Sequence, residues 1–358
     1  MSDRPARTGR LHLGLDAGGT STRAVVCTAD GECLGYAAGA AGNPTSAGPE
    51  AALAAVAGTS AAALADAGRG ADELGSVLLA MAGVSRMLPL PEVARAVGYT
   101  GDPARLRTGP DILAMYFSGS AEPTGAAVVA GTGSIAAQVR GGRMTLAVGG
   151  CGWLLGDGGS GFAVGHAVVR AVVAELEGTG PATSLTPALL AALGLERGSV
   201  GEAGRLRGLE QLVDVCYSER PVALARHAPL AFAAADGGDA VAGRLVRSAQ
   251  DDLARLVAAA REGAPDAPLV LGGSTMHRGL LAPGRPRTPA LADALAGADV
   301  RPARDGAVGA AVAALAALGG AADAVPADVV ERLHRTVGAR RAAVERAAAA
   351  PVPGAAVP

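Results

Sequence analysis

A strand, a turn of glycine and threonine, and a second strand follow one another at two places in this sequence. The first copy, LGLDAGGTSTRAVV, covers residues 13–26, and the second, AVVAGTGSIAAQV, covers residues 127–139. Each lies near the start of an expected three-stranded meander. One such turn is typical of a simple hairpin. Two copies are less ordinary, and they predict two similar units, each built around a sheet.

The hydrophobic pattern predicts a mixed α/β chain with a helix-rich stretch between residues 160 and 262. We expect strands at residues 11–16, 22–28, 32–38, 76–83, 105–109 and within 267–277, and three more from residue 125 onward. We expect helices at residues 50–67, 89–97, 161–177, 203–217, 222–235, 238–262, 306–322 and 326–347, and one that begins at Asp111. This alternation indicates the α/β fold class.

Composition and charge exclude several kinds of partner. A formal net charge of -2 provides no basic surface for nucleic acid. No apolar run of signal-peptide length precedes Leu11, and the Ala- and Gly-rich stretch 306–322 is typical of a buried helix rather than a membrane span. The cysteines, none in a CxxC pair, are Cys27, Cys33, Cys151 and Cys216. They indicate neither a zinc site nor a disulfide framework. We expect a cytoplasmic protein with no nucleic-acid or membrane partner.

The sequence contains no lysine, so every basic side chain is an arginine. A P-loop requires a lysine on the nucleotide phosphates, and a protein kinase requires a lysine on a strand. Both classes are therefore excluded. A nucleotide bound by this chain would be held by backbone amides and hydroxyl groups, with a metal ion to balance its charge.

Four segments, in order, resemble the sugar kinase, Hsp70 and actin superfamily over residues 11–320. They are DAGGTSTR, VVAGTGS, GGCGWLLGDGGSGFAVGHAVV and LVLGGS. The resemblance is greatest to the branch that holds N-acetylglucosamine kinases and the activator ATPases of 2-hydroxyacyl-CoA dehydratases and benzoyl-CoA reductase. It implies an α/β fold with two ribonuclease-H-like domains and an ATP cleft between them, the actin-like ATPase fold.

The same resemblance implies how the domains divide the chain. A flexible N-terminus would cover residues 1–10, and the N-terminal domain residues 11–118. The C-terminal domain, with a helical insertion, would cover residues 119–304. C-terminal helices are expected at 305–348, the first of them returning to the N-terminal domain, and a disordered tail at 349–358.

ATP and Mg²⁺ are the cofactors that the resemblance implies. Asp16 would bind Mg²⁺ through water. The β and γ phosphates would be held by Gly18, Gly19, Thr20 and Ser21 and, from the other domain, by Gly131, Thr132 and Gly133. The adenosine would be lined by Gly272, Gly273 and Ser274. None of these contacts needs a lysine.

Asp111 is the expected catalytic base. In the family an aspartate opens a helix after a short strand at the end of the first domain and accepts the proton of the attacking sugar hydroxyl. Here the segment TGPD, residues 108–111, has that place. One carboxylate beside the hydroxyl is sufficient for phosphoryl transfer through a loose transition state. The alternative is that Asp111 is an ordinary N-cap.

Asn43 and Asp157 resemble two sugar-binding residues of the family, although an Asn-Pro turn and a cap for the helix after Ser160 are the respective alternatives. Gly150 and Gly152 would present backbone amides. The expected substrate-binding set is Asn43, Asp111, Thr132, Gly150, Cys151, Gly152 and Asp157.

Two departures from the family pattern affect the sugar side. Cys151 replaces a tryptophan, the one Trp being at 153, and Gly158 replaces a glutamate. The first removes a ring that could wall the pocket, and the second removes a carboxylate. Cys151 could also be a packing residue. The sugar preference therefore stays open among N-acetylglucosamine, glucosamine, N-acetylmannosamine and N-acetylmuramic acid.

We expect an ATP-dependent kinase that phosphorylates an amino sugar, in the first place N-acetylglucosamine, at its 6-hydroxyl. One alternative is an activator-type ATPase, but its iron–sulfur cluster needs paired cysteines, and neither Cys151 nor Cys216 has a second cysteine nearby in sequence. Another is a non-catalytic sugar or nucleotide sensor, against which the presence of Asp16 and Asp111 argues. The amino sugar and ATP are the expected partners, and a homodimer stays open.

Overall fold

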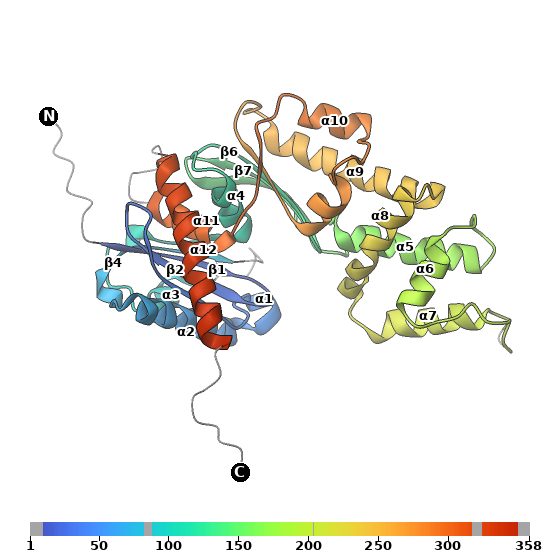
Figure 1. Cartoon of the computed structure of the whole chain (residues 1–358), viewed down its shortest axis with the longest axis horizontal. Helices are drawn as coiled ribbons and strands as arrows, with labels where there is room; N and C mark the ends of the chain where they lie inside the picture. The colour runs from blue at the N-terminus through green and yellow to red at the C-terminus, as the bar shows by residue number, and fades with distance from the viewer. Residues whose placement is uncertain (1–9, 82–87, 203, 317–323, 350–358) are drawn as a thin grey trace, which may run out of the picture. The chain divides into compact units, whose positions relative to one another are not determined.

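The computed structural model describes residues 10–81, 88–202, 204–316 and 324–349 (Figure 1). Its contacts divide the chain into two units. Unit 1 contains residues 1–125, 139–145 and 301–358, and unit 2 contains residues 126–138 and 146–300. The expected flexible start at 1–10 and disordered tail at 349–358 fall almost entirely on residues 1–9 and 350–358, which lie outside the described residues, although residue 349 is the last of a helix.

Unit 1 is built on a five-stranded sheet with the order β3-β2-β1-β4-β5. The strands are β1 (Leu11–Ala17), β2 (Thr22–Cys27), β3 (Cys33–Gly39), β4 (Leu74–Met81) and β5 (Leu106–Pro110). The first three form an antiparallel meander, while β4 pairs in parallel with both β1 and β5. The carboxyl ends of β1, β4 and β5 therefore lie at one edge, which is where α/β sheets bind ligands.

Helices cover both faces of this sheet (Figure 1). They are α1 (Pro44–Ala47), α2 (Pro49–Ala67), α3 (Leu90–Val97), α4 (Asp111–Gly119), α11 (Gly306–Ala316) and α12 (Ala327–Ala349). Leu13 and Leu15 of β1 share a core with Val56 and Leu64 of α2. Side chains alternate along a strand, so the intervening residues of β1 face the opposite side, where α11 lies.

Helix α11 lies very close to both the sheet and helix α4 because glycines lie at the contacts. A Cβ on Gly14 of β1 would lie 2.2 Å from the backbone nitrogen of Ala311, and a Cβ on Gly309 would lie 1.8 Å from the carbonyl oxygen of Ala114. The sequence predicted a buried helix here, and every residue from 306 to 315 is buried. Residues 317–322 of the expected helix lie outside the described part of the chain.

Unit 2 contains most of a second five-stranded sheet, with the order β10-β9-β6-β7-β8. Its strands are β6 (Gly125–Ala130), β7 (Ser134–Arg140), β8 (Arg143–Gly149), β9 (Leu269–Gly272) and β10 (Val300–Pro302). Strands β6 and β9 are parallel, so the turns after them lie at the same edge. The expected three strands from residue 125 are thereby confirmed.

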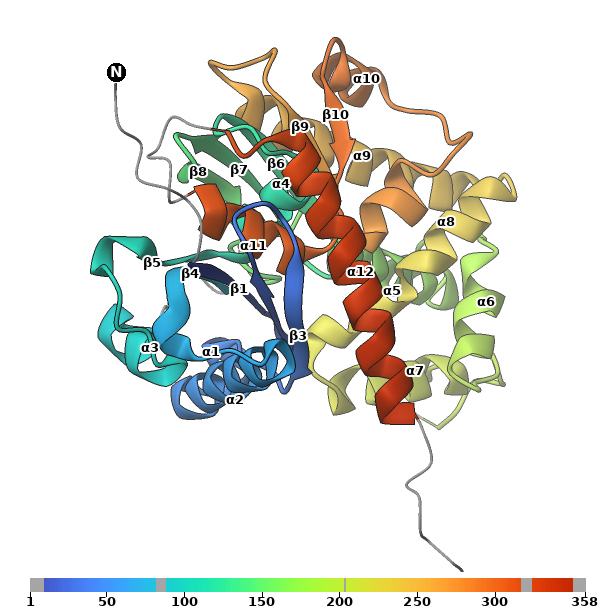
Figure 2. The ribbon, with the colours of Figure 1, turned by 60° about the vertical axis from the view of Figure 1, so that its left-hand side comes forward.

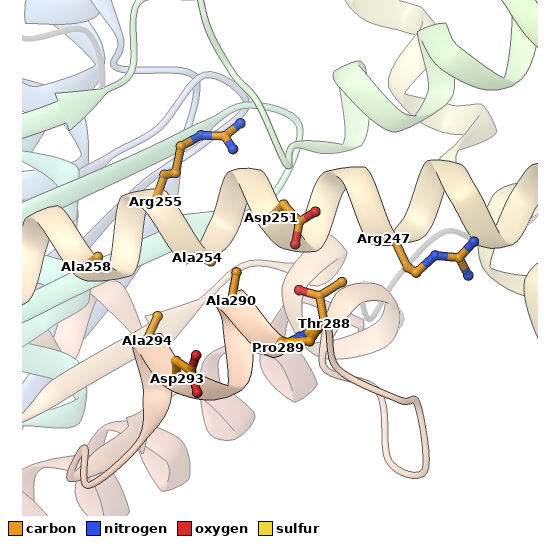
Figure 3. Close-up of a pocket in the computed structure, with 10 residues that line it drawn as sticks. All are labelled: Arg247, Asp251, Ala254, Arg255, Ala258, Thr288, Pro289, Ala290, Asp293 and Ala294. Atoms are coloured by element: carbon orange, nitrogen blue, oxygen red, sulfur yellow. The ribbon is translucent and has the colours of Figure 1, made fainter.

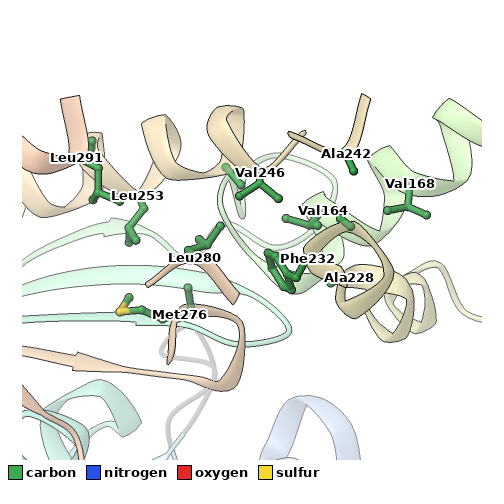
Figure 4. Packing of buried hydrophobic residues seen from close by; sticks show 14 of the residues in the cluster. Val164, Val168, Ala228, Phe232, Ala242, Val246, Leu253, Met276, Leu280 and Leu291 are labelled. Carbon is green, nitrogen blue, oxygen red and sulfur yellow. The ribbon is translucent and has the colours of Figure 1, made fainter. Parts of the chain in front are cut away.

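The rest of unit 2 is mainly helical. Its α-helices are α5 (Gly161–Leu176), α6 (Leu185–Ala192), α7 (Arg207–Ser218), α8 (Ala228–Asp236), α9 (Ala240–Arg261) and α10 (Pro289–Leu295). Figure 4 shows how Val168 of α5, Phe232 of α8, Leu253 of α9 and Met276 after β9 pack into one core. This core joins the helices to the sheet that carries the glycine turns.

The sequence interpretation missed several short elements of unit 2. Helices α6 and α10 and strand β10 were not expected. The helix expected at 222–235 is instead a 3-10 helix, Pro221–His227, followed by α8. Pro229 explains this break because it lies in the first turn of α8, where a missing N–H costs no helical hydrogen bond.

No helix among the described residues has both the length and the apolar character needed to cross a membrane.

Candidate active site

The turn between β1 and β2 presents Gly19 and Thr20 to solvent at one edge of the first sheet. Gly18 N–H donates to the carbonyl of Ser21 at 2.9 Å, which closes the turn. The segment that follows β3 supports the turn, because Gly42 N–H donates a hydrogen bond to the carbonyl of Gly18 at 3.2 Å. In the expected first phosphate loop, Gly19 and Thr20 are therefore exposed, while the strand residues Ala17 and Thr22 on either side of the turn are buried.

Asp16, the last but one residue of β1, points to the side of the sheet that α11 covers. Its carboxylate forms an ion pair with Arg23, its antiparallel partner on β2. A Cβ on Gly306, the first residue of α11, would lie 2.6 Å from Asp16 Oδ2. Burial raises the pKa of Asp16 and Arg23 opposes that rise, while the charge of Asp305 adds to it.

Asp111 is the first residue of α4 and follows directly on β5. The N-cap position belongs to Pro110, so the alternative of an ordinary aspartate N-cap is wrong. The Asp111 side chain does accept a hydrogen bond from Ile112 N–H at 2.8 Å. Burial raises the pKa of Asp111, and the negative charge of Asp16 raises it further. Asp16 near the end of β1 and Asp111 directly after β5 lie at the same edge of the unit 1 sheet, because both strands pair in parallel with β4.

Asn43 has a local role that the sequence left as one alternative. Its side-chain oxygen accepts a hydrogen bond from Thr45 N–H at 2.8 Å, and it caps the short helix α1, with Pro44 next to it. The Asn-Pro turn is therefore present, and contact with a sugar stays a prediction.

The second glycine turn, residues 131–134, rests on the N-terminus of α5 in unit 2. Gly161 and Phe162 N–H groups donate to the carbonyls of Gly131 and Thr132 at 2.7 and 3.0 Å. Thr275 Oγ1 donates to the same Gly131 carbonyl at 2.9 Å. Thr132 itself is exposed, and no described atom lies within 4 Å of a Cβ built on Gly131. The carbonyl groups of the turn are therefore held by α5 and Thr275, while Thr132 remains accessible to solvent.

The third glycine segment follows β9 and lies against the second turn. A Cβ on Gly273, which has φ 99°, would lie 2.2 Å from the carbonyl oxygen of Ala130. Only a glycine permits this approach between the ends of β6 and β9. Ser274 next to it is exposed. Unit 2 therefore brings the expected second phosphate loop and the expected adenosine loop together.

Asp157 connects the expected sugar-binding segment to the second glycine turn. Among the described residues it is the one non-glycine with positive φ, at 63°. It is buried, and its Oδ1 accepts a hydrogen bond from Ser134 N–H at 3.2 Å. The N-cap of α5 is Ser160, whose Oγ accepts from Ala163 N–H at 3.1 Å, so the capping alternative for Asp157 is wrong. Strained backbone of this kind is frequent at functional sites.

The segment before Asp157 exposes apolar side chains. Gly149, Gly150 and Gly152 all have positive φ, and Cys151 between them is exposed. The ring centroids of Trp153 and of Phe162 on α5 are 5.7 Å apart, yet Trp153 remains 42% exposed. The expected glycine amides and Cys151 therefore lie in one turn-rich, accessible segment.

Three charged residues near the site were not found by sequence reasoning. Asp252 of α9 occupies the space beside Gly158, since a Cβ at 158 would lie 2.9 Å from its Cγ. Arg23 forms ion pairs with both Asp16 and Asp305. The β1–β2 hairpin register could have revealed Arg23, whereas Asp252 and Asp305 are distant in sequence.

An open groove lies between α9 and α10, and Arg255 in its lining forms an ion pair with Asp252. Its volume is about 860 Å³. Figure 3 shows alanines of both helices facing each other along it, with Arg247, Asp251 and Arg255 on α9 and Asp293 on α10. No expected site residue lines it.

The carboxylates of the described residues fit Mg²⁺ held chiefly by a nucleotide. No group of three or more His, Cys, Asp or Glu side chains among them is arranged to hold a metal by itself. Mg²⁺ typically keeps several water ligands and uses one or two carboxylates with substrate phosphates. Asp16, at the base of the exposed first turn, meets that requirement.

The chain is similar in sequence to known proteins along most of its length. The BadF/BadG/BcrA/BcrD ATPase family matches residues 13–314. An N-acetyl-D-glucosamine kinase of Dictyostelium discoideum is 28% identical over 259 residues, which are 69% of this chain and 78% of that protein.

Two solved structures are similar along most of the chain. A proposed N-acetylglucosamine kinase from Chromobacterium violaceum is 26% identical with a TM-score of 0.63, and the match covers 85% of this chain and 99% of that chain. Another from Porphyromonas gingivalis is 20% identical with a TM-score of 0.56, over 85% and 97%. With the two five-stranded sheets, these matches confirm the expected fold class.

Proposed function

Because this chain belongs to the BadF/BadG/BcrA/BcrD ATPase family, we propose that it uses ATP to phosphorylate an amino sugar. The proposed substrate is N-acetylglucosamine, since the Dictyostelium relative and the Chromobacterium structure are both named for that activity. The proposed acceptor is the 6-hydroxyl group. The observation that carries the proposal is the position of two carboxylates, Asp16 and Asp111, at the same edge of the first sheet, because β1 and β5 both pair in parallel with β4.

Asp111 is the proposed general base. A carboxylate in this role must be ionised before the reaction and must then take the proton of the attacking hydroxyl. Such transfer is most efficient when the pKa of the base is near the working pH. Burial and the charge of Asp16 both move the pKa of Asp111 in that direction.

Asp16 is the proposed ligand, through water, of Mg²⁺ bound with ATP. The metal ion would neutralise negative charge on the transferred phosphoryl group. The protein would contribute an ionised carboxylate at a fixed place. Arg23 favours that ionised form, and the approach of Gly306 leaves no room for a side chain on that side of the carboxylate.

The glycine turns are the proposed phosphate and adenosine contacts. Gly18, Gly19, Thr20 and Ser21 would hold the phosphates from unit 1, and Gly131, Thr132 and Gly133 from unit 2. Gly272, Gly273 and Ser274 would line the adenosine. The support is that Gly19, Thr20, Thr132 and Ser274 are exposed on turns whose bases are hydrogen bonded. Backbone N–H groups on such turns bind anions.

The proposed sugar contacts are Asn43, Asp111 and, in unit 2, Thr132, Gly150, Cys151, Gly152 and Asp157. Asp157 is the best supported of the unit 2 group. It is buried and held by Ser134, so a second acceptor oxygen on the same carboxylate would be rigidly oriented toward sugar hydroxyls. Exposed Trp153 lies four residues before it and is the proposed apolar wall in place of a ring at position 151.

Sugar-dependent ADP release tests the proposed function. Purified protein with MgATP would be assayed against N-acetylglucosamine, glucosamine, N-acetylmannosamine, N-acetylmuramic acid, glucose and no sugar. We expect the greatest stimulation by N-acetylglucosamine, with phosphate on the 6-hydroxyl by ³¹P and ¹³C NMR of the product. Equal ADP release with and without sugars would contradict a sugar kinase.

Light scattering of the purified protein in the same buffer would test whether it forms a homodimer. Cell fractionation would test the proposed cytoplasmic location.

A further inference from the structure

Helix α12, the last described helix, lies along the edge strand β3 of unit 1 (Figure 2). Three side chains fix it there. Arg332 pairs with Asp30 at 2.6 Å, Arg340 pairs with Asp66 at 2.7 Å, and Thr336 Oγ1 accepts a hydrogen bond from Cys33 N–H at 3.1 Å. These contacts all attach α12 to the β2–β3 region and to α2.

Arg341 of the same helix has a different partner. Its Nη1 lies 2.8 Å from Oδ2 of Asp305, the residue before α11. Asp305 is itself fixed, because its Oδ1 accepts from Ala307 N–H at 2.9 Å and its carbonyl accepts from Gly309 N–H at 3.0 Å. Arg341 therefore reaches a carboxylate that is anchored to the start of α11.

Asp305 continues the contact toward the site. Its Oδ1 lies 3.2 Å from Arg23 Nη1, and Arg23 Nη2 pairs with Asp16. Four charges alternate in sign from α12 to β1: Arg341, Asp305, Arg23 and Asp16. The two aspartate side chains are only 16% and 14% exposed, so water screens the inner contacts less than it screens a surface pair.

We propose that Arg23, Asp305 and Arg341 are positioning residues, through which α12 orients the carboxylate of Asp16 toward the metal-bound nucleotide. The inference rests on the proposed role of Asp16. Arg23 holds one oxygen of that carboxylate, and Asp305 holds the guanidinium of Arg23 through a second N–H group. A planar guanidinium can make both contacts at once, which a lysine ammonium cannot do with the same fixed geometry.

The first test compares ion pairs on one helix. R341Q removes the outer end of the network, while R332Q and R340Q remove ion pairs of α12 that do not reach Asp305. We expect R341Q to weaken MgATP binding and to lower kcat, each by about 5-fold, and R23Q to do so by about 100-fold, because misplaced groups at a reacting phosphate are costly. The two control variants should match the wild type in both quantities, and the KM for the sugar should be unchanged throughout.

Calorimetric titration with MgATP separates positioning from simple loss of stability. A variant that is merely less stable has fewer folded molecules, but each one binds MgATP with the normal Kd. R341K should recover part of the affinity lost in R341Q, because it keeps the charge. The proposal is overturned if R341Q has the same Kd and kcat as R340Q.

A second readout needs no activity. In protein labelled with ¹⁵N-arginine, the side-chain Nε–H signal of Arg23 is assigned as the signal that disappears in R23K. We expect the Arg23 signal to shift in R341Q and to stay in place in R332Q, because Arg341 pairs with Asp305 and Arg332 does not. An unchanged Arg23 signal in R341Q would show that Arg341 is not coupled to this position.

These tests remain informative if no sugar is phosphorylated. Binding of MgATP and the NMR signal depend on the nucleotide site and not on the acceptor. A protein that binds MgATP normally and releases no ADP with any sugar would contradict the proposed function and leave the positioning network standing. Loss of coupling between Arg341 and Arg23 would contradict the network alone.

Discussion

At the scale of single residues, the candidate site consists of carboxylates held in environments that change their chemistry. Asp111 is half-buried beside Asp16, and its pKa is raised by burial and by that neighbouring charge. Asp157 is buried with a positive φ and accepts a hydrogen bond from Ser134 N–H in the second glycine turn. Both are kept in costly arrangements, which is common where a side chain serves a ligand rather than the fold.

D111N should lower kcat by two or more orders of magnitude and leave the affinity for ATP nearly unchanged, because it removes a general base without changing shape. Asp102 offers a matched control, since its side chain makes a similar local hydrogen bond, to Ala104 N–H at 3.0 Å, at the start of another helix. D102N should therefore keep normal activity. Steady-state kinetics with saturating sugar measure both, and equal kcat for D111N and the wild type would refute the role of Asp111.

The raised pKa of Asp111 has a consequence for stability with a definite sign. A carboxyl group whose folded pKa exceeds its unfolded value stabilises the protein when protonated, and that contribution is lost as pH rises through the folded pKa. At pH 7 the ionised Asp111 should therefore cost stability, and D111N should melt at the same or a higher temperature than the wild type. The difference should be smaller at pH 4 and should vanish at lower pH, below the unfolded pKa of about 3.9. Thermal unfolding of both proteins at the two pH values is the measurement, and a D111N protein that is less stable only at pH 7 would contradict the assignment.

D157A should destabilise unit 2 by about 1–3 kcal/mol, because it leaves Ser134 N–H without its buried acceptor and keeps a strained φ. D157N should be nearly as stable as the wild type, since asparagine tolerates positive φ and its oxygen can accept the same bond. If Asp157 also binds the sugar, D157N should still raise the KM for it. Urea unfolding and kinetics together separate the two roles, and equal stability of D157A and D157N would disprove the structural one.

At the scale of elements, α11 and α12 connect the C-terminal part of the chain to the first sheet in different ways. Helix α11 is attached by close apolar packing that small residues allow. Helix α12 is attached by solvent-exposed ion pairs, such as Arg332 with Asp30, and by a few buried side chains, such as Leu333 and Val337. The first attachment should tolerate almost no added volume, and the second should tolerate it well.

Two glycine-to-alanine changes test this contrast. G309A places a methyl group 1.8 Å from the carbonyl oxygen of Ala114, so α11 or α4 must move, and we expect a loss of about 3 kcal/mol or more. G338A in α12 has no described atom within 4 Å of the new methyl group. It should raise stability by up to about 1 kcal/mol, because alanine favours helix more than glycine does. Denaturant unfolding measures both, and similar values for the two variants would contradict the described packing of α11.

At the scale of the whole molecule, each unit supplies its own part of the proposed nucleotide site. Unit 1 carries Asp16 and the first glycine turn, and unit 2 carries the second turn and the segment after β9. Within each unit these parts lie where parallel strands end, so the sheets determine which loops come together.

Binding of MgATP should therefore stabilise the folded protein against heat. A ligand at 100 times its Kd contributes about 2.7 kcal/mol when it binds the folded state alone. ATP with EDTA should give a smaller rise in Tm than MgATP, and D16N should abolish the difference between the two conditions. Differential scanning fluorimetry measures these shifts. Equal protection by ATP with and without Mg²⁺ in the wild type would contradict a metal site at Asp16.

The sequence by itself determined most elements, the fold class and the positions of the glycine turns. Apolar alternation produces strands, and glycine with threonine after a strand produces a turn, so these features depend on residues close together in the chain. Motifs at strand ends then indicated Asp16 and Asp111. Their proposed roles remain predictions, although the structure places both carboxylates at the same edge of the first sheet.

Only the tertiary structure decided the contacts between distant residues. Arg23 and Asp305 are 282 positions apart, and Asp252 reaches Gly158 from another helix. Helices α6 and α10 are short, so the sequence pattern did not predict them, and only the tertiary structure shows them. Local propensity is a property of neighbouring residues, whereas an ion pair or a close approach depends on how sheets and helices pack in space. For this reason the role of Asp305, which pairs with Arg23 beside Asp16, and the contacts that hold Asp157 could not be predicted from the sequence.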